Sequence, residues 1–211
     1  MMNRQNMVLA GRAVNDGLRQ DLSAMRNNLR QLIQISKRNV EIQQRMDELG
    51  DIVLQCPDLE TLVAKTTSAI KEYFGLTTVT YALSTDFRDL MPQTEPLHIK
   101  SMSADKLFFL DPEKLAQIFA RSQGPILRGK LDHGSVDFFC LRELRRIHSE
   151  ALTPLFYNNE RIGSINLGSN DPDRYAEGVA TDYLRRLAHL TSLALVNLRL
   201  RHEVAKKRTG E

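Results

Sequence analysis

The sequence predicts an α+β protein, with an antiparallel sheet flanked by helices and a long helix at the amino terminus. Two observations support this class. Apolar residues recur at helical spacing in the first third of the chain, and in later segments apolar and polar residues alternate with a period of two. The 211 residues provide for one domain of about 150 residues and an appendage. We predict a helical stalk over 1–55, a domain over 56–205 and a basic tail over 206–211.

The stalk is predicted from a heptad seam in which apolar side chains alternate at spacings of four and three residues. The seam slips in phase after residue 32, which would overwind a coiled coil locally, and Asn39 lies on the slipped part. We favour pairing between two chains, and the alternative is a helix folded back on its own domain. The seam consists of Leu18, Leu22, Met25, Leu29 and Leu32, and continues through Ile35, Ile42, Met46, Leu49 and Val53.

A helix break follows at Cys56-Pro57-Asp58, because proline disfavours the α conformation in the residue before it. Asp58 can cap a second helix, and Gly75 can end it. From Leu76 the period changes to two, which predicts a half-buried strand over residues 78–83.

Further elements follow in the middle of the chain. We expect strands near 97–102, 107–110 and 125–128. Asp111-Pro112 predicts a helix start, with aspartate as the cap and proline at the first helical position. The segment 129–146 lacks a clear period.

The last third predicts a β-hairpin and a final helix. Two runs in which apolar and polar residues alternate surround a tight polar turn at residues 158–160. A helix is expected over 181–202, followed by a frayed tail. The apolar face of this helix is wider than one sheet requires, which indicates a second partner. The dimer contacts expected on it are Leu193, Val196 and Leu200.

The stretch GSNDPDRYAEGVATDYLRRLA, residues 168–188, joins the hairpin to the last helix. A phosphate loop would need clustered glycines followed by lysine, and an acid–base pair would need desolvated carboxylates. We interpret the stretch as structural. Asp171 opens a turn, Arg174 pairs with a carboxylate, Tyr175 anchors the turn, and Thr181 caps the helix.

The turn G-S-x-D-P-x-R-aromatic, followed by T-D-Y-L-x-x-L-A, resembles a signature of the bacterial domain of unknown function 484, a GAF-like family. LRQLIQISKRNVEIQQRMDEL is similar to the family's stalk, and EALTPLFYNNERIGSINLGSND is similar to the hairpin before the signature. The resemblance implies a small-molecule-sensing fold. A His-Pro-Asp-Phe-Phe-like region, frequent at the family's amino terminus, is missing here.

Chemistry is sparse in this sequence. The net charge of +3 is too small to indicate a nucleic-acid binder, and no apolar stretch is long enough to span a membrane. Cys56 and Cys140 are far apart, unlike the clustered cysteines of GAF-type methionine sulfoxide reductases. The spacing of His98, His133 and His148 does not indicate a metal site. No nucleophile or acid–base pair is visible, so we expect a cytoplasmic protein that is not an enzyme; the sequence indicates no particular cofactor.

A ligand, if one binds, is expected beneath the segment 129–148, against the sheet face away from the first and last domain helices. Long irregular segments in compact domains are usually functional or disordered, and this one is rich in apolar side chains. We expect a dimeric regulatory or small-molecule-sensing module. The alternative is a structural adaptor with a closed core. The candidate ligand-binding residues are Tyr81, His133, Phe138, Cys140, Arg142, His148, Thr153 and Asn166.

Overall fold

The computed structural model describes the backbone of residues 4–91, 105–120, 122–179 and 181–209, and the side chains of these residues from 22 to 208. The chain forms two compact units, Met1–Arg45 and Met46–Glu211, which are described separately. The strand expected near residues 97–102 lies outside the described residues. The sequence-based division at residues 55 and 205 stays a prediction.

The first unit is helical and belongs to α1 (Arg4–Leu54), as the heptad spacing predicted. The side chains of residues 22–40 are all exposed, including Leu22, Met25, Leu29 and Leu32. Leu18 lies in the helix, but its side chain is outside the described set.

The end of α1 belongs to the second unit and contributes to its core. Met46, Leu49 and Val53 are buried within the chain's own domain. The expectation that these three residues continue an intermolecular seam is therefore wrong.

Helix α2 (Leu59–Phe74) begins and ends as the sequence predicted. The Asp58 carboxylate accepts a hydrogen bond from the Thr61 amide at 2.7 Å, which satisfies one of the free amides of the first turn. Gly75 ends the helix in the left-handed conformation, with φ 58°.

The sheet has five strands in the order β2-β1-β5-β4-β3. Pairs β1–β5, β5–β4 and β4–β3 are antiparallel as expected, but β1 and β2 are parallel, so the sheet is mixed. A parallel pair needs a long connection between its strands, and residues 85–106 separate these two strands in the sequence. The strands are β1 (Thr78–Ser84), β2 (Leu107–Leu110), β3 (Ile126–Arg128), β4 (Ser149–Tyr157) and β5 (Glu160–Ser169).

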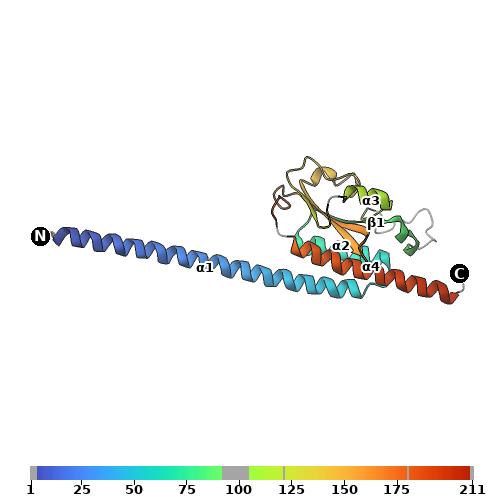
Figure 1. Ribbon diagram of the computed structural model, residues 1–211, viewed down its shortest axis with the longest axis horizontal. Coiled ribbons are helices and arrows are strands. Elements are labelled where there is room, and N and C mark those ends of the chain that lie inside the picture. The colour runs from blue at the N-terminus through green and yellow to red at the C-terminus, as the bar shows by residue number, and fades with distance from the viewer. Residues whose placement is uncertain (1–3, 92–104, 121, 180, 210–211) are drawn as a thin grey trace. The chain divides into compact units, whose positions relative to one another are not determined.

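Both faces of the sheet are covered (Figure 1). Helices α2 and α4 (Asp182–Thr209) pack on one face, called the helix face below. Helix α3 (Pro112–Ile118) and the segment 129–148, which includes the short 3₁₀ helix η2 (Leu144–Arg146), cover the other, called the cap face. Every residue of β1 is buried, so this strand is not half-buried as the alternation predicted.

The β4–β5 hairpin has the tight turn that the sequence predicted. Asn158 and Asn159 have φ values of 47° and 64°, which fits a two-residue hairpin turn of the type that asparagine favours. A second 3₁₀ helix, η1 (Thr85–Leu90), follows β1. Helix α4 continues to Thr209, so the segment expected to fray is largely helical. Among the described residues, no helix combines the length and the apolar character that crossing a membrane requires.

Candidate functional site

The segment 129–148 covers the cap face with aromatic side chains rather than leaving space beneath it. Phe138 and Phe139 are 2% and 1% exposed, and the Phe138 ring lies 6.2 Å from that of Phe119 at a tilt of 57°. The two phenylalanines therefore occupy the place where we expected a ligand. The core cluster on this face comprises Ala82, Leu115, Phe119, Phe138, Phe139, Leu144, Ile147 and Leu152.

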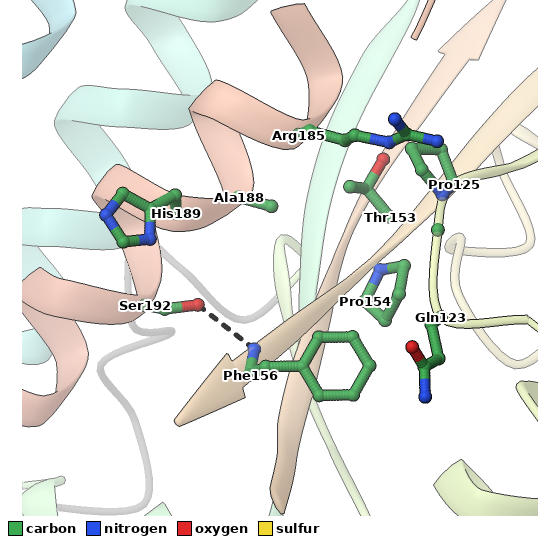
Figure 2. Close-up of a pocket in the computed structure, with 10 residues that line it drawn as sticks. Gln123, Pro125, Thr153, Pro154, Phe156, Arg185, Ala188, His189 and Ser192 are labelled. Carbon is green, nitrogen blue, oxygen red and sulfur yellow. Dashed lines mark hydrogen bonds between the residues drawn. The ribbon is translucent and has the colours of Figure 1, made fainter. Parts of the chain in front are cut away.

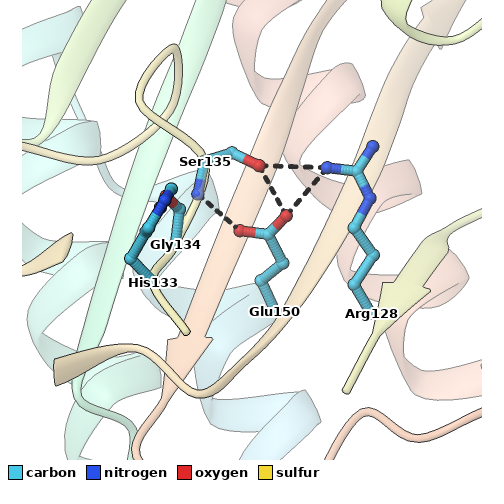
Figure 3. A network of polar contacts seen from close by, with 5 residues as sticks. All are labelled: Arg128, His133, Gly134, Ser135 and Glu150. Atoms are coloured by element: carbon cyan, nitrogen blue, oxygen red, sulfur yellow. Dashed lines mark hydrogen bonds and ion pairs between the residues drawn. The ribbon is translucent and has the colours of Figure 1, made fainter. Parts of the chain in front are cut away.

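A buried carboxylate fastens this segment to the sheet (Figure 3). Glu150 of β4 is fully buried and accepts hydrogen bonds from the Ser135 amide at 2.9 Å and the Ser135 hydroxyl at 2.6 Å. The Arg128 guanidinium lies 3.0 Å from the same carboxylate and also donates to the Ser135 hydroxyl. A buried carboxylate needs such partners, because removing its hydration is costly. Glu150 was not among the residues selected from the sequence.

A second polar contact holds the middle of the segment. The Thr80 hydroxyl donates to the Phe138 carbonyl at 2.6 Å, and Asn166 donates to Thr80 at 3.4 Å. Ser164 in turn donates to the Asn166 side-chain carbonyl at 2.9 Å. These groups pair with one another, and this arrangement leaves the cap face closed rather than open to a ligand.

Six of the eight residues proposed for a ligand site lie on the cap face or in the segment that covers it, but they do not surround one cavity. Phe138 and Asn166 are buried on the cap face. His133 is exposed and contacts the Gly134 carbonyl, while the half-buried His148 contacts the Leu131 carbonyl at 3.2 Å.

Cys140 and Arg142 line an open cleft of about 550 Å³ at the start of β1, with Lys71, Lys106 and Arg146 also on its walls. Arg142 forms an ion pair with Asp105. The cleft carries both charge signs, because Asp105 and Glu143 line it as well.

Tyr81 and Thr153 lie on the opposite, helix face, so the expectation that they face the segment 129–148 is wrong. In the ladder, Tyr81 pairs with Ile165, which pairs with Thr153, and paired residues share a face. The Tyr81 hydroxyl lies 2.8 Å from that of Thr66 in α2. Burial raises the pKa of Tyr81 to about 12, which identifies a core residue rather than a titrating site.

A separate pocket of about 160 Å³ opens between β4, α4 and the residues before β3 (Figure 2). Its walls include Thr153, Arg185 and His189. Apart from Thr153, the residues of this pocket were not predicted, because its polar side chains come from β4, α4 and the residues before β3, which meet only in the folded domain.

The stretch 168–188 is a structural connection, as we interpreted it, although one pairing differs. Arg174 donates to the Phe74 carbonyl at the end of α2, at 2.5 Å, rather than to a carboxylate. Tyr175 is 7% exposed, and burial raises its pKa to about 12. The Ser149 hydroxyl donates to the Asp171 carbonyl at 2.6 Å, which ties the turn to β4.

A family model described as "Protein of unknown function, DUF484" matches residues 3–199. The chain belongs to the DUF484 family. The resemblance noted in the sequence is thereby confirmed. A comparison of this DUF484 protein with curated proteins gives no match.

Solved structures confirm the GAF-like fold. The free methionine-R-sulfoxide reductase from Neisseria meningitidis has a TM-score of 0.53 at 21% identity, over 76% of this chain and 91% of that one. The GAF domain of an Acinetobacter phosphoenolpyruvate-protein phosphotransferase has a TM-score of 0.50 at 10% identity, over 77% and 97%. At these identities the likeness establishes the fold alone.

The expectation that the DUF484 protein is not an enzyme is contradicted by the first of these structures, because that protein is a reductase with the same fold. The absence of a catalytic motif in the sequence was therefore not sufficient for that conclusion. The two cysteines are free here: Cys56 is buried at the end of α1, and the half-buried Cys140 lies in the segment 129–148. In the described part of the chain, no group of three or more His, Cys, Asp or Glu side chains is arranged to hold a metal ion.

Proposed function

We propose that this DUF484 protein is a homodimeric cytoplasmic regulatory module, in which α1 pairs two copies and the GAF-like domain acts as an adaptor surface. The observation that carries the proposal is the exposed apolar seam of α1. Leu22, Met25, Leu29 and Leu32 are 55%, 71%, 58% and 63% exposed.

Such a seam favours a partner helix for energetic reasons. Isolated helices are marginal in water, and most helical stability comes from burying an apolar face. Full burial of one leucine or methionine side chain contributes about 1.5–3 kcal/mol. The spacing of four and three residues is the one with which a second copy of the same helix interlocks.

Helix α4 offers a second apolar surface for the same purpose. Leu193 and Leu200 are 51% and 52% exposed after the helix has packed on the sheet. Val204 extends this surface by a further turn and is 51% exposed. Val196, which we also expected at the dimer contact, is only 8% exposed because it packs in its own domain. It is therefore not part of the proposed interface.

The closed cap face supports an adaptor rather than a sensor that binds beneath the segment 129–148. Phe138 and Phe139 fill that space, and Glu150 and Thr80 hold the segment down. A ligand there would have to displace aromatic core side chains and separate a buried carboxylate from its partners. We therefore assign the regulatory role to the surfaces of the domain.

The test is the oligomeric state of charge variants in α1. Met25→Glu with Leu32→Glu places carboxylates on the seam, while Asn27→Glu with Gln34→Glu adds the same charge to the opposite side of the helix. Sedimentation at about 10 μM should give a dimer for the wild type and the control, and a monomer for the seam variant. A monomeric wild type, or equal effects of the two variants, would refute the proposal.

A further inference from the structure

The pocket between β4 and α4 contains a buried hydroxyl with no partner. Thr153 is 1% exposed, and its oxygen has no hydrogen-bond partner among the described residues. The side chain forms part of the pocket wall (Figure 2). A buried polar group without a partner costs about 1–3 kcal/mol, so an unpaired hydroxyl at a pocket wall indicates a missing acceptor or donor.

The other polar groups of this pocket are mainly donors. Arg185 forms no ion pair with any described residue, and its guanidinium presents donors in a planar fork that matches a carboxylate. The Ser192 oxygen accepts from the Phe156 amide at 3.2 Å, which leaves the Ser192 hydroxyl proton free to donate. The ten lining residues include no aspartate or glutamate. The pocket therefore favours an anion with oxygen acceptors.

The remaining walls determine the shape of such an anion. Pro125, Pro154, Phe156 and Ala188 provide apolar surface next to the donors. The volume of about 160 Å³ is close to that of an engineered protein cavity that accepts benzene, a molecule of about six heavy atoms. Gly124 lies beside the Arg185 guanidinium, since a Cβ at that position would be in ordinary van der Waals contact with it at 3.5 Å.

We propose that this pocket binds a short-chain carboxylate of about three to five carbons. Arg185 holds the carboxylate group and Thr153 donates to one of its oxygens, while Gln123 and His189, which also line the pocket, can each donate as well as accept. The proline and phenylalanine walls contact the aliphatic chain. The site is on the helix face, away from the closed cap face, and does not depend on dimerisation.

The probe is sodium butyrate, titrated into the full ¹⁵N-labelled chain at constant ionic strength. Saturable shifts should appear at the amides of Thr153, Arg185 and Ser192. Arg185→Gln should weaken binding about tenfold or more, whereas Arg186→Gln removes the same charge from the neighbouring position of α4 and should leave binding unchanged. Arg186 pairs with Asp47 outside the pocket.

Thr153→Val separates loss of binding from loss of folding. This variant removes an unpaired hydroxyl at nearly constant volume, so its unfolding midpoint should rise while its affinity for butyrate falls severalfold. Two further compounds test what the pocket recognises. Sodium phosphate is an anion without an aliphatic chain, and n-butylamine has a similar chain but a positive charge. Binding of phosphate without butyrate, equal binding of butylamine, shifts confined to other surfaces, or no saturation at about 100 mM butyrate would overturn the assignment.

Discussion

The Glu150 carboxylate accepts hydrogen bonds from both the amide and the hydroxyl of Ser135, at 2.9 and 2.6 Å. This pair joins strand β4 to a segment that contains little regular structure. Because the carboxylate is fully buried, its interactions are not shared with bulk water. The closed state of the cap face therefore depends on one side chain from the sheet as well as on the aromatic residues above it.

Replacing this carboxylate should loosen the segment. Glu150→Gln removes the charge that Arg128 and Ser135 face, and we expect a loss of about 1–3 kcal/mol in the free energy of unfolding. Urea denaturation measures the loss, and limited proteolysis should detect faster cleavage within residues 129–148. Glu160→Gln, an exposed position in the hairpin, is the control. Equal stability of the two variants would contradict the role given to Glu150.

Truncating Phe138 should open the cap face. Phe138→Ala removes a side chain that is 2% exposed, and such changes cost about 3–5 kcal/mol. Phe138→Leu should cost less and serves if the alanine variant does not fold. The resulting cavity should bind benzene, seen as a rise in melting temperature that the wild type does not show. Tyr157→Ala, at an exposed ring, should change stability little, and a similar loss in both variants would count against a filled core.

Alkaline pH should destabilise the protein through its buried tyrosines. Burial raises the pKa of both Tyr81 and Tyr175 from 10.0 to about 12. The unfolded chain then releases these protons at lower pH than the folded chain. The contribution of the two protonated tyrosines to the free energy of unfolding is complete below pH 10 and is lost as pH rises towards 12. Circular dichroism at fixed urea across this range should show the decline, with a shallower slope for Tyr81→Phe. An unchanged slope in that variant would exclude Tyr81 as a cause.

Arg174 should contribute to stability without contributing to binding. Its guanidinium donates to the Phe74 carbonyl at 2.5 Å and lies 5.8 Å from the Tyr175 ring centre. Arg174→Ala should lower the free energy of unfolding by about 1–2 kcal/mol. The exposed Arg145→Ala is the control. If Arg174→Ala keeps its stability but loses butyrate affinity, the turn belongs to a binding site and our structural interpretation is wrong.

Local signals in the sequence predicted most of the individual elements. The proline after Cys56, the cap at Asp58, the glycine at 75 and the asparagine turn at 158–159 each act within a few residues, so a single sequence reveals them. The parallel pairing of β2 with β1 escaped prediction, because it depends on the path of a long crossover rather than on local alternation.

Sites were harder to predict than elements. Alternation assigns residues of one strand to two faces, but it does not say which face of one strand matches which face of another. Thr153 was therefore grouped with Asn166, although the ladder places them on opposite faces of the sheet. Glu150 lies in a mostly buried strand, where a charged residue is unusual. This unusual position was the one sign in the sequence that Glu150 makes a buried polar contact.

The buried polar row across β1 and β5 also has a consequence for assembly of the sheet. Asn166 lies opposite Thr80 in the ladder, where its amide has partners. A slip of one residue between these strands would turn every side chain to the other face, and would separate the amide of Asn166 from Thr80. A misaligned pairing therefore loses the hydrogen bonds that join Thr80, Asn166 and Ser164. Strands with only aliphatic side chains would lose no such bonds, so these three residues favour the correct register.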